Sequence, residues 1–339
     1  MWLNVVWYVL FMAIVGGYLI LDGFDLGVGI LHPFVARTDT ERRIVLNSIG
    51  PVWDGNEVWL VLAGGVLFAV FPFVYAALFS GFYLAIMLVL LCLILRPVAI
   101  EFRSQRPDPR WRAIWDWVFF GASAGLALLL GTALGDILSG VPLDAQGNIT
   151  VSLIDLLKPY PLLIGVTTVA MFAMHGALYL ALKTEDVLQA RVKSWLPRLM
   201  IAFFALNTFV VIGTVALRRE VTERYLTQYW PVIFPALALG ALILSWYMLQ
   251  RSRYLEAFAA SAAVIALLIV SVAVGLYPNL LLSTISPSYN LTAFNAASEA
   301  NTLAVALIIA AIGIPLVLLY TSGVYYFFKG KVKLERESY

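Results

Sequence analysis

Two carboxylates interrupt the first apolar segment of the chain, within the stretch Leu21-Asp22-Gly23-Phe24-Asp25-Leu26-Gly27-Val28-Gly29. Asp22 and Asp25 are three residues apart, so on a helix they share one face. A carboxylate at membrane depth costs about 2.5–3.5 kcal/mol on insertion scales, and therefore faces protein or a wet cavity. Gly23 and Gly27 form a GxxxG step, which predicts close backbone packing against another helix. The acids either serve a functional site or hydrogen-bond neighbouring helices.

The composition predicts an all-α integral membrane protein. Of the 339 residues, 62% are hydrophobic and 12% are charged, and the mean hydropathy is +0.91. An ordinary soluble domain carries about 25% charged residues. A soluble fold could not hide this much apolar surface from water, whereas lipid solvates it. The aromatic share of 14% is typical of interfacial belts.

Nine segments are long and apolar enough to span a bilayer, because a hydrocarbon core about 30 Å thick requires about 20 apolar residues per helix. They are 6–31, 54–72, 77–99, 116–138, 160–182, 198–217, 230–249, 256–277 and 303–328. Pro72 marks the break after the second segment, since it lacks a backbone donor. Most connections are short, which favours antiparallel neighbours. We expect one membrane domain over 1–339, built as two four-helix bundles plus a peripheral helix.

Basic residues distinguish the two ends of these predicted helices. Of the 22 Lys and Arg residues, nearly all lie in or beside the connections that follow odd-numbered helices, or in the C-terminal tail; the exceptions are Lys158, Arg218, Arg219 and Arg224. The positive-inside rule then predicts an external N-terminus and a cytoplasmic C-terminus. The first segment lacks a basic n-region and is too long for a signal peptide, so we expect it to remain as a helix. The net charge of +2 implies no nucleic-acid partner.

A second acidic stretch, Trp53-Asp54-Gly55-Asn56-Glu57-Val58-Trp59, opens the second predicted helix. Asp54 and Glu57 are again three residues apart, on the side of the membrane where the first helix ends. The two acid pairs could therefore meet and form a proton entry or a cation site. Capping remains an alternative for Asp54, because the helix dipole favours an acid at the N-terminus. Glu101, after the third helix, either extends the acid track or is a surface group paired with Arg103.

Other polar residues are explained by capping, solvation or hydrogen bonding between helices. Asp116 is expected to be an interfacial cap, whereas Asp136 and Glu299 are expected to be solvated. His32 is expected to be solvated at the interface. His175 is either an axial heme ligand, a role that histidine commonly serves, or a histidine hydrogen-bonded between helices.

The chain shows no signature of a self-contained enzyme. Its single cysteine, Cys92, excludes an internal disulfide and any multi-cysteine metal site. Two histidines at different depths cannot by themselves build a multi-heme electron path. The sequence also lacks a GxxxxGK[ST] loop, a GxGxxG fingerprint after a strand and an HExxH helix.

Several ordered motifs resemble subunit II of the cytochrome bd quinol oxidases. They include Asp22-Gly23-Phe24-Asp25-Leu26-Gly27, Trp53-Asp54-Gly55-Asn56-Glu57-Val58-Trp59, Gly64-Gly65-Val66-Leu67-Phe68-Ala69, Arg96-Pro97-Val98 and Trp115-Asp116-Trp117. Gly140-Val141-Pro142 and Leu182-Lys183-Thr184-Glu185 continue the likeness. It covers essentially the full length and is densest over 20–117.

The resemblance implies a subunit of a prokaryotic plasma-membrane complex that oxidises quinol and reduces O2 to water. In that family subunit I binds two b-type hemes and one d-type heme, and subunit II packs against it with a similar nine-helix fold. No heme is therefore expected to be ligated by this chain. Some members also contain a small single-helix subunit, hold a structural quinone or route O2 through subunit II.

The resemblance also implies a proton path from the cytoplasm to the hemes. By motif, its positions here correspond to Asp25, Asp54 and Glu101, with Asp22 and Glu57 beside them. Glu101 stands where other members have Asp, which keeps the charge but moves it by a methylene. The rival hypothesis is a proton- or sodium-coupled secondary transporter built around the same acids, since such proteins place acids near the midplane and use Gly-rich helices.

Overall fold

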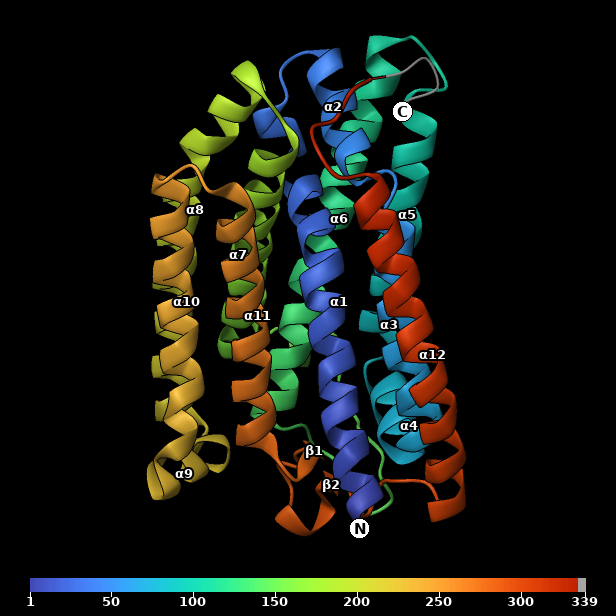
Figure 1. The fold of residues 1–339 in the computed structure, drawn as a ribbon. Helices are drawn as coiled ribbons and strands as arrows, with labels where there is room; N and C mark the ends of the chain where they lie inside the picture. The colour runs from blue at the N-terminus through green and yellow to red at the C-terminus, as the bar shows by residue number, and fades with distance from the viewer. Residues whose placement is uncertain (335–339) are drawn as a thin grey trace.

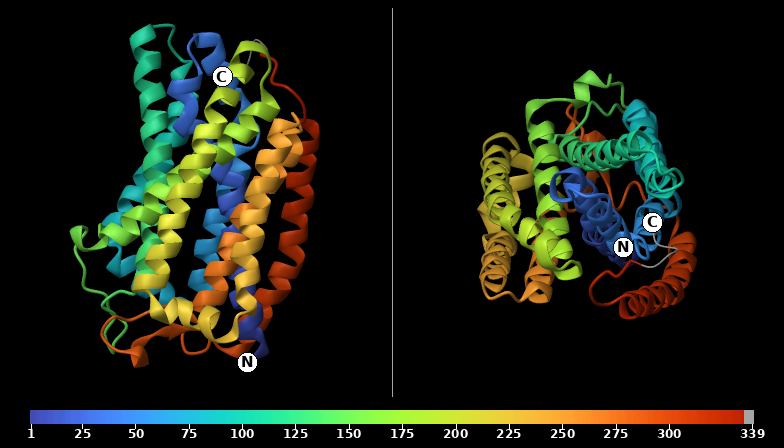
Figure 2. Two further views of the ribbon diagram at one scale, coloured as in Figure 1. Left: turned by 90° about the vertical axis from the view of Figure 1, so that its left-hand side faces the viewer. Right: turned by 90° about the horizontal axis from the view of Figure 1, so that it is seen from above.

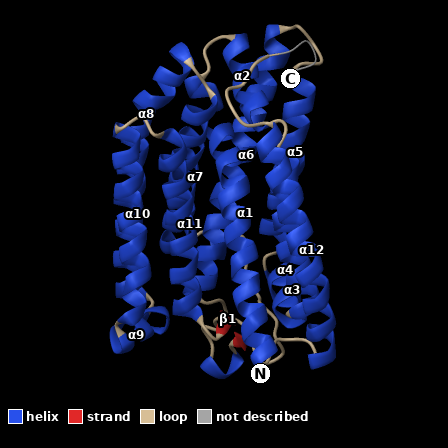
Figure 3. Ribbon diagram, viewed as in Figure 1, coloured by secondary structure: helices blue, strands red, loops and turns tan. Residues whose placement is uncertain are grey.

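Long helices running side by side make up most of the chain in a computed structural model that describes residues 1–334 (Figures 1 and 3). The basic residue Arg336 lies outside this range. The long helices are α1 (Trp2–Val35), α3 (Trp53–Val70), α5 (Tyr83–Arg103), α6 (Pro109–Ser139), α7 (Pro159–Lys183), α8 (Asp186–Leu217), α10 (Ile233–Gln250), α11 (Tyr254–Leu276) and α12 (Ala300–Phe327). Over the described residues, eight helices are long and apolar enough to cross a membrane, or nine if one bent pair forms a single span. The predicted all-α membrane fold is confirmed.

The bent pair is where the predicted boundaries were wrong. The break at Pro72 is present, but α4 (Pro72–Gly81) turns 118° away from α3. Residues 77–81 therefore belong to α4, and the third span begins only at Tyr83 in α5. A side chain at Gly81 would collide with Ile149, so glycine permits this close turn. Pro72 occupies the first turn of α4, where its missing N–H costs no helical hydrogen bond.

Shorter elements lie at the two ends of the bundle. Helix α2 (Asp39–Ile49) lies at the end of the bundle where α12 ends, whereas α9 (Arg219–Gln228) lies at the opposite end with the N-terminus (Figure 1). That second end also holds β1 (Asn279–Leu281) and β2 (Leu291–Thr292), which pair antiparallel. Single 3-10 turns occupy η1 (Ile154–Leu156), η2 (Trp230–Val232) and η3 (Pro287–Tyr289). Helix α2 is not among the predicted helices, although the capping box of Thr38 and Glu41 signals its start.

The spanning helices pack as two groups with one outlying helix. Helices α1, α3, α5 and α6 form one group, and α7, α8, α10 and α11 form the other. Helix α12 packs on α1 and α3 at the edge of the bundle, and only 6% of its most apolar window is buried (Figure 2). The predicted bundle arrangement is therefore present, but the groups are not separate. Helix α6 packs along α7 more extensively than along any other helix.

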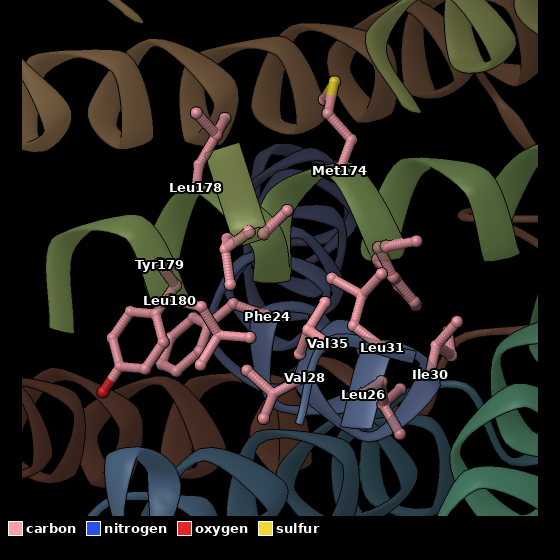
Figure 4. Packing of buried hydrophobic residues seen from close by; sticks show 14 of the residues in the cluster. Phe24, Leu26, Val28, Ile30, Leu31, Val35, Met174, Leu178, Tyr179 and Leu180 are labelled. Carbon is pink, nitrogen blue, oxygen red and sulfur yellow. The ribbon is translucent and has the colours of Figure 1, made fainter. Parts of the chain in front are cut away.

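A continuous hydrophobic core joins the two groups where α1 meets α7. Figure 4 shows residues of this core on α1, among them Phe24, Leu26 and Val28, and on α7, among them Leu178 and Tyr179. The rings of Phe24 and Tyr179 stack with centroids 4.1 Å apart. Burying a large apolar side chain contributes about 1.5–3 kcal/mol when water is the alternative; between helices already in lipid, close packing matters more.

Glycine makes the closest approach of α1 to α7 possible. A Cβ on Gly27 would collide with the carbonyl of Phe172 and with the Cα of Gly176. A Cβ on Gly23 would meet the ring of Phe172, and one on Gly29 would meet Ser123 of α6. The GxxxG step of the sequence therefore brings the backbones of α1 and α7 together, as predicted. This contact holds the acid-bearing part of α1 inside the bundle.

Replacing Gly27 with alanine is expected to destabilise the protein by about 1–3 kcal/mol, the usual cost of overpacking. The obstacle is the backbone of α7, which cannot rotate away. The thermal midpoint of the purified protein in detergent measures the loss. Gly313→Ala on α12 is the matched control, since a Cβ there meets nothing within 4 Å. Equal midpoints for the two variants would contradict this account of the seam.

Candidate functional site

Asp22 is paired with an arginine inside the bundle. The guanidinium of Arg96, from α5, donates to the two Asp22 oxygens at 2.8 and 2.5 Å. Both side chains are fully buried. Glu57 of α3 completes the group, with an oxygen 3.2 Å from Nη2 of Arg96 and a side chain that is 20% exposed. Asp22 thus has a bidentate, charge-compensating partner, the strongest geometry for such a pair.

Asp25 lies one turn further along α1 and has a different environment. Its Oδ2 accepts a hydrogen bond from the Asn56 amide of α3 at 2.7 Å. The amide oxygen of Asn56 accepts in turn from the hydroxyl of Tyr325, on α12, at 2.9 Å. The other carboxyl oxygen, Oδ1, is buried and has no hydrogen-bond partner among the described residues. Asp25 is therefore a buried carboxyl group whose hydrogen-bond partner among residues 1–334 is a neutral amide.

The remaining predicted acids lie at the surface of the chain. Asp54, in the first turn of α3, is exposed, and so is Glu101 near the end of α5. The structure therefore brings Asp22, Asp25 and Glu57 together, and leaves Asp54 one turn from Glu57 on α3. The suggestion that Glu101 pairs with Arg103 was wrong, because Arg103 is buried and bonded to other acids.

Asp116 forms a second buried charged cluster with His32, Arg42 and Arg103. Nε2 of His32 lies 2.6 Å from one Asp116 oxygen, and Nε of Arg103 donates to the same oxygen at 2.6 Å. Arg42 donates to the other Asp116 oxygen. Arg103 also donates to Asp39, at the start of α2, at 2.9 Å. This cluster joins α1, α2, α5 and α6.

Two expectations from the sequence are therefore wrong. His32 is fully buried rather than solvated, and Asp116 is the centre of an ion-pair network rather than an interfacial cap. The arginines come from segments far apart in the sequence, so no local spacing revealed the cluster. The sequence did contain a signal for this cluster: three arginines lie within 37–43 and four within 103–112. Arginines near buried helix ends need acidic partners.

A third ion pair ties α2 to α8. Arg191 donates to Glu41 at 2.8 Å and to the carbonyl of Val35 at 2.5 Å. The bond from Arg191 lowers the pKa of Glu41 to about 2, helped by the backbone N–H groups of Arg37 and Thr38. The first turn of α2 is thus bound both to the α5–α6 hairpin, through Asp39 and Arg42, and to α8, through Glu41.

His175 is hydrogen-bonded between helices, which was one of its two predicted roles. Nδ1 lies 2.7 Å from the hydroxyl oxygen of Ser261 in α11, and Nε2 lies 3.1 Å from the carbonyl oxygen of Ile20 in α1. The imidazole also stacks on Phe258 with centroids 4.6 Å apart. Both ring nitrogens are occupied and the group is fully buried, so His175 does not fit an axial heme ligand in this arrangement.

Of the two acids expected to be solvated, Asp136 and Glu299, only one is exposed. Asp136 is 4% exposed, so the expectation that it is solvated was wrong. It lies near the C-terminal end of α6, where the neighbouring Gly135 packs closely against Pro161 of α7. Glu299 is exposed, as expected. Across residues 1–334, no group of three or more His, Cys, Asp or Glu side chains could hold a metal ion.

Comparison with known proteins places this arrangement in a family. The chain is 37% identical to the probable cytochrome oxidase subunit 2 of Haemophilus influenzae, over 94% of this chain and 92% of that protein. It is 34% identical to the cytochrome bd-I ubiquinol oxidase subunit 2 of Escherichia coli, over 98% and 96%. It is 33% identical to the cytochrome bd ubiquinol oxidase subunit 2 of Bacillus subtilis, over 97% of each.

A solved structure has the same fold. The bd oxidase of Geobacillus thermodenitrificans includes a chain that matches with a TM-score of 0.76 at 16% identity, over 97% of this chain and 99% of that one. Fold and relatives together define a membrane subunit of a terminal respiratory oxidase. The chain belongs to the family of cytochrome bd terminal oxidase subunit II, whose model matches residues 3–328. This membership favours the oxidase hypothesis over the secondary transporter.

Removing the charge of Arg96 is expected to be severely destabilising. Arg96→Gln leaves the buried Asp22 carboxylate without its cation, which typically costs about 3–5 kcal/mol. Adding Asp22→Asn to Arg96→Gln should recover most of that loss, because the fully buried carboxylate is then neutral and only the partly exposed Glu57 lacks its cation. Thermal denaturation of the purified complex measures both. Arg253→Gln, which breaks the exposed pair with Glu256, is the control and should change little. A double variant no more stable than Arg96→Gln would refute this role.

Proposed function

We propose that this chain conducts protons toward the hemes of subunit I in a bacterial bd-type quinol oxidase, and stabilises that subunit. Reduction of O2 to water consumes protons, so heme sites inside a membrane need a supply line. The relatives from E. coli and B. subtilis are named as ubiquinol oxidase subunits, which supports quinol and O2 as substrates of the complex. The observation that carries the proposal is Asp25, a buried carboxyl group with one oxygen free.

The acids divide into one fixed charge and several exchangeable ones. Asp22 is locked in a bidentate pair with Arg96, so we assign it a structural role beside the path. Asp25 has only an amide partner, and Glu57 makes a single ion pair and reaches the surface. Carboxyl groups and water conduct protons when they form a hydrogen-bonded line and change protonation readily. Glu101, exposed near the end of α5, would receive protons from water, and Asp54 would carry them at the outward face of α3.

The outward face of α3 supports docking of subunit I there. Asp54, Val61 and Phe68 follow one another at seven-residue spacing, so they line one helix face, and all three are exposed. Gly65, on the same stripe, meets nothing within 4 Å if given a Cβ. A carboxylate facing lipid is costly, and small residues allow close helix approach. A protein partner would satisfy both features.

The direction of proton uptake follows from charge. Most basic residues lie toward the end of the bundle that holds α2 and the C-terminus (Figure 1). By the positive-inside rule this end is cytoplasmic. Asp25 is ten residues from the end of α1 at that side. Uptake from the cytoplasm for chemistry at hemes within the membrane would move charge across part of the bilayer, which makes turnover electrogenic.

Hemes would be held by subunit I rather than by this chain. Both nitrogens of His175 are already bonded, and His32 is engaged by Asp116. When bound in the partner, the hemes supply electron transfer and O2 reduction. The residues of this chain would conduct protons toward those hemes and stabilise the interface with subunit I.

Asp25→Asn and Asp54→Asn are expected to slow quinol-driven O2 consumption at least tenfold in complexes that still assemble. An amide cannot take up and release a proton as a carboxyl group does. O2 electrode rates, normalised to heme content from a reduced-minus-oxidised spectrum, measure the effect. Glu299→Gln, an exposed acid at the opposite end of the bundle, is the control. Wild-type rates in fully assembled Asp25→Asn would exclude the proton path; loss of the heme spectrum would indicate a structural role.

Gly65→Leu is expected to weaken assembly with subunit I, because a bulky side chain would hold the partner helix away. The amount of heme that co-purifies with this chain measures the association. Gly240→Leu on α10 is the matched control, since its Cβ also meets nothing within 4 Å but lies in the other group of helices. Equal heme yields for the two variants would remove α3 as the docking face.

A further inference from the structure

Tyr325 is an exception on an otherwise peripheral helix. Helix α12 packs mainly on α1 and α3, and its one buried residue is Leu303, near its start. In the last turn, Tyr326 and Phe327 are 65% and 82% exposed. Tyr325 instead points inward, half-buried, and its hydroxyl reaches Asn56. One side chain of α12 therefore enters the acid site.

The hydrogen bonds from Tyr325 to Asp25 have a defined polarity. The tyrosine hydroxyl donates to the Asn56 carbonyl oxygen, which leaves the Asn56 NH2 group as the donor to Asp25. An amide N–H does not exchange roles with its oxygen at ordinary pH, so this chain of bonds does not pass a proton. Oδ2 of Asp25 is thereby committed as an acceptor. Oδ1, buried and without a partner, is the oxygen left to bind a proton.

We propose that Tyr325 and Asn56 are positioning residues that hold the Asp25 carboxyl group so that it gains and loses its proton at Oδ1, and that α12 thereby controls the proton path. The inference rests on the proposed proton-conducting function. It assigns a role to a helix that buries little of its surface. It also means that protons do not reach Asp25 through Tyr325 and Asn56.

The end of α12 is held in place by the segment that follows it. Lys183, the last residue of α7, donates to the carbonyl of Phe328 at 2.5 Å. Lys331 donates to the carbonyl of Thr184 at 2.6 Å, and the Val332 N–H donates to that of Lys183 at 3.0 Å. These bonds fasten the chain after α12 to the end of α7. Tyr325 is thus anchored from the tail as well as through Asn56.

Other titratable or charged groups near Asp25 come from five helices. Asp22 lies on α1, Glu57 on α3 and Arg96 on α5, and Tyr179 and Tyr325 approach from α7 and α12. The Tyr179 hydroxyl already donates to the carbonyl of Ser48 at 2.7 Å. Only Asn56 among the described side chains donates a hydrogen bond to Asp25.

The test uses the assembled oxidase and removes one oxygen atom. Tyr325→Phe keeps the ring but deletes the hydroxyl, and should lower O2 consumption about two- to tenfold, the range for one net hydrogen bond. Because proton delivery becomes more limiting, the solvent deuterium isotope effect should rise and the pH profile of turnover should shift. Tyr326→Phe, the exposed neighbour, is the matched control and should match the wild type. Heme content must be unchanged in both.

A double variant separates positioning from structure. Asn56→Leu removes both hydrogen bonds and should slow turnover more than Tyr325→Phe. Adding Tyr325→Phe to Asn56→Leu should then have no further effect, because Tyr325 acts only through Asn56. The infrared carboxyl band that disappears in Asp25→Asn should shift in Tyr325→Phe and in Asn56→Leu, which reports the contact even if one variant assembles poorly.

The outcomes distinguish this inference from the proton path itself. If Asp25→Asn slows turnover but Tyr325→Phe has wild-type rates, isotope effect and infrared band, the positioning role is wrong and the path stands. If the two effects add in the double variant, Tyr325 acts by another route and the inference fails. If Asp25→Asn has no effect on turnover, the proposed function itself fails.

Discussion

The close approach of α1 to α7 is the constraint on which the rest of the structure depends. Gly27 of α1 lies against the backbone of Phe172 and Gly176 of α7, where no larger residue fits. Because that contact pulls α1 between the two groups of helices, its acids cannot face lipid and must find partners inside. Arg96 and Asn56 supply those partners from α5 and α3. The close backbone contact and the polar site therefore occur together on α1.

Two neighbouring acids on one helix have acquired different chemistry through their partners. Asp22 meets a guanidinium that matches both of its oxygens, so its charge is fixed. Asp25 meets an amide, which orients one oxygen and leaves the other free. In the proposed proton path, Asp22 would keep its charge while Asp25 gains and loses a proton. Asp116 resembles Asp22, because two arginines from other helices bind its buried carboxylate and the ion pairs join those helices.

The helical architecture could be read from the sequence because it depends on local properties. Apolar segment length sets the spans, and the glycines of the first span revealed its close packing before any partner was known. The errors occurred where distant segments meet. The start of the third span was misplaced because the chain bends between α3 and α4, and α4 ends at Gly81, which packs against Ile149 of a distant loop. Helix α2 was missed although its capping box was present, since its apolar face is short.

Sequence by itself determined that this chain lies in a membrane, which family it resembles and which acids carry an unusual energetic cost. Those properties follow from residue type and spacing along one helix. Tertiary structure alone decided which acid is paired, which is free and which is exposed, because each partner comes from a different helix. His32 and Asp116 were predicted to lie at the interface, but α2 and α5 bring Arg42 and Arg103 against Asp116 and the site is buried. Burial and charge compensation depend on neighbours in space, and residue order does not specify those neighbours.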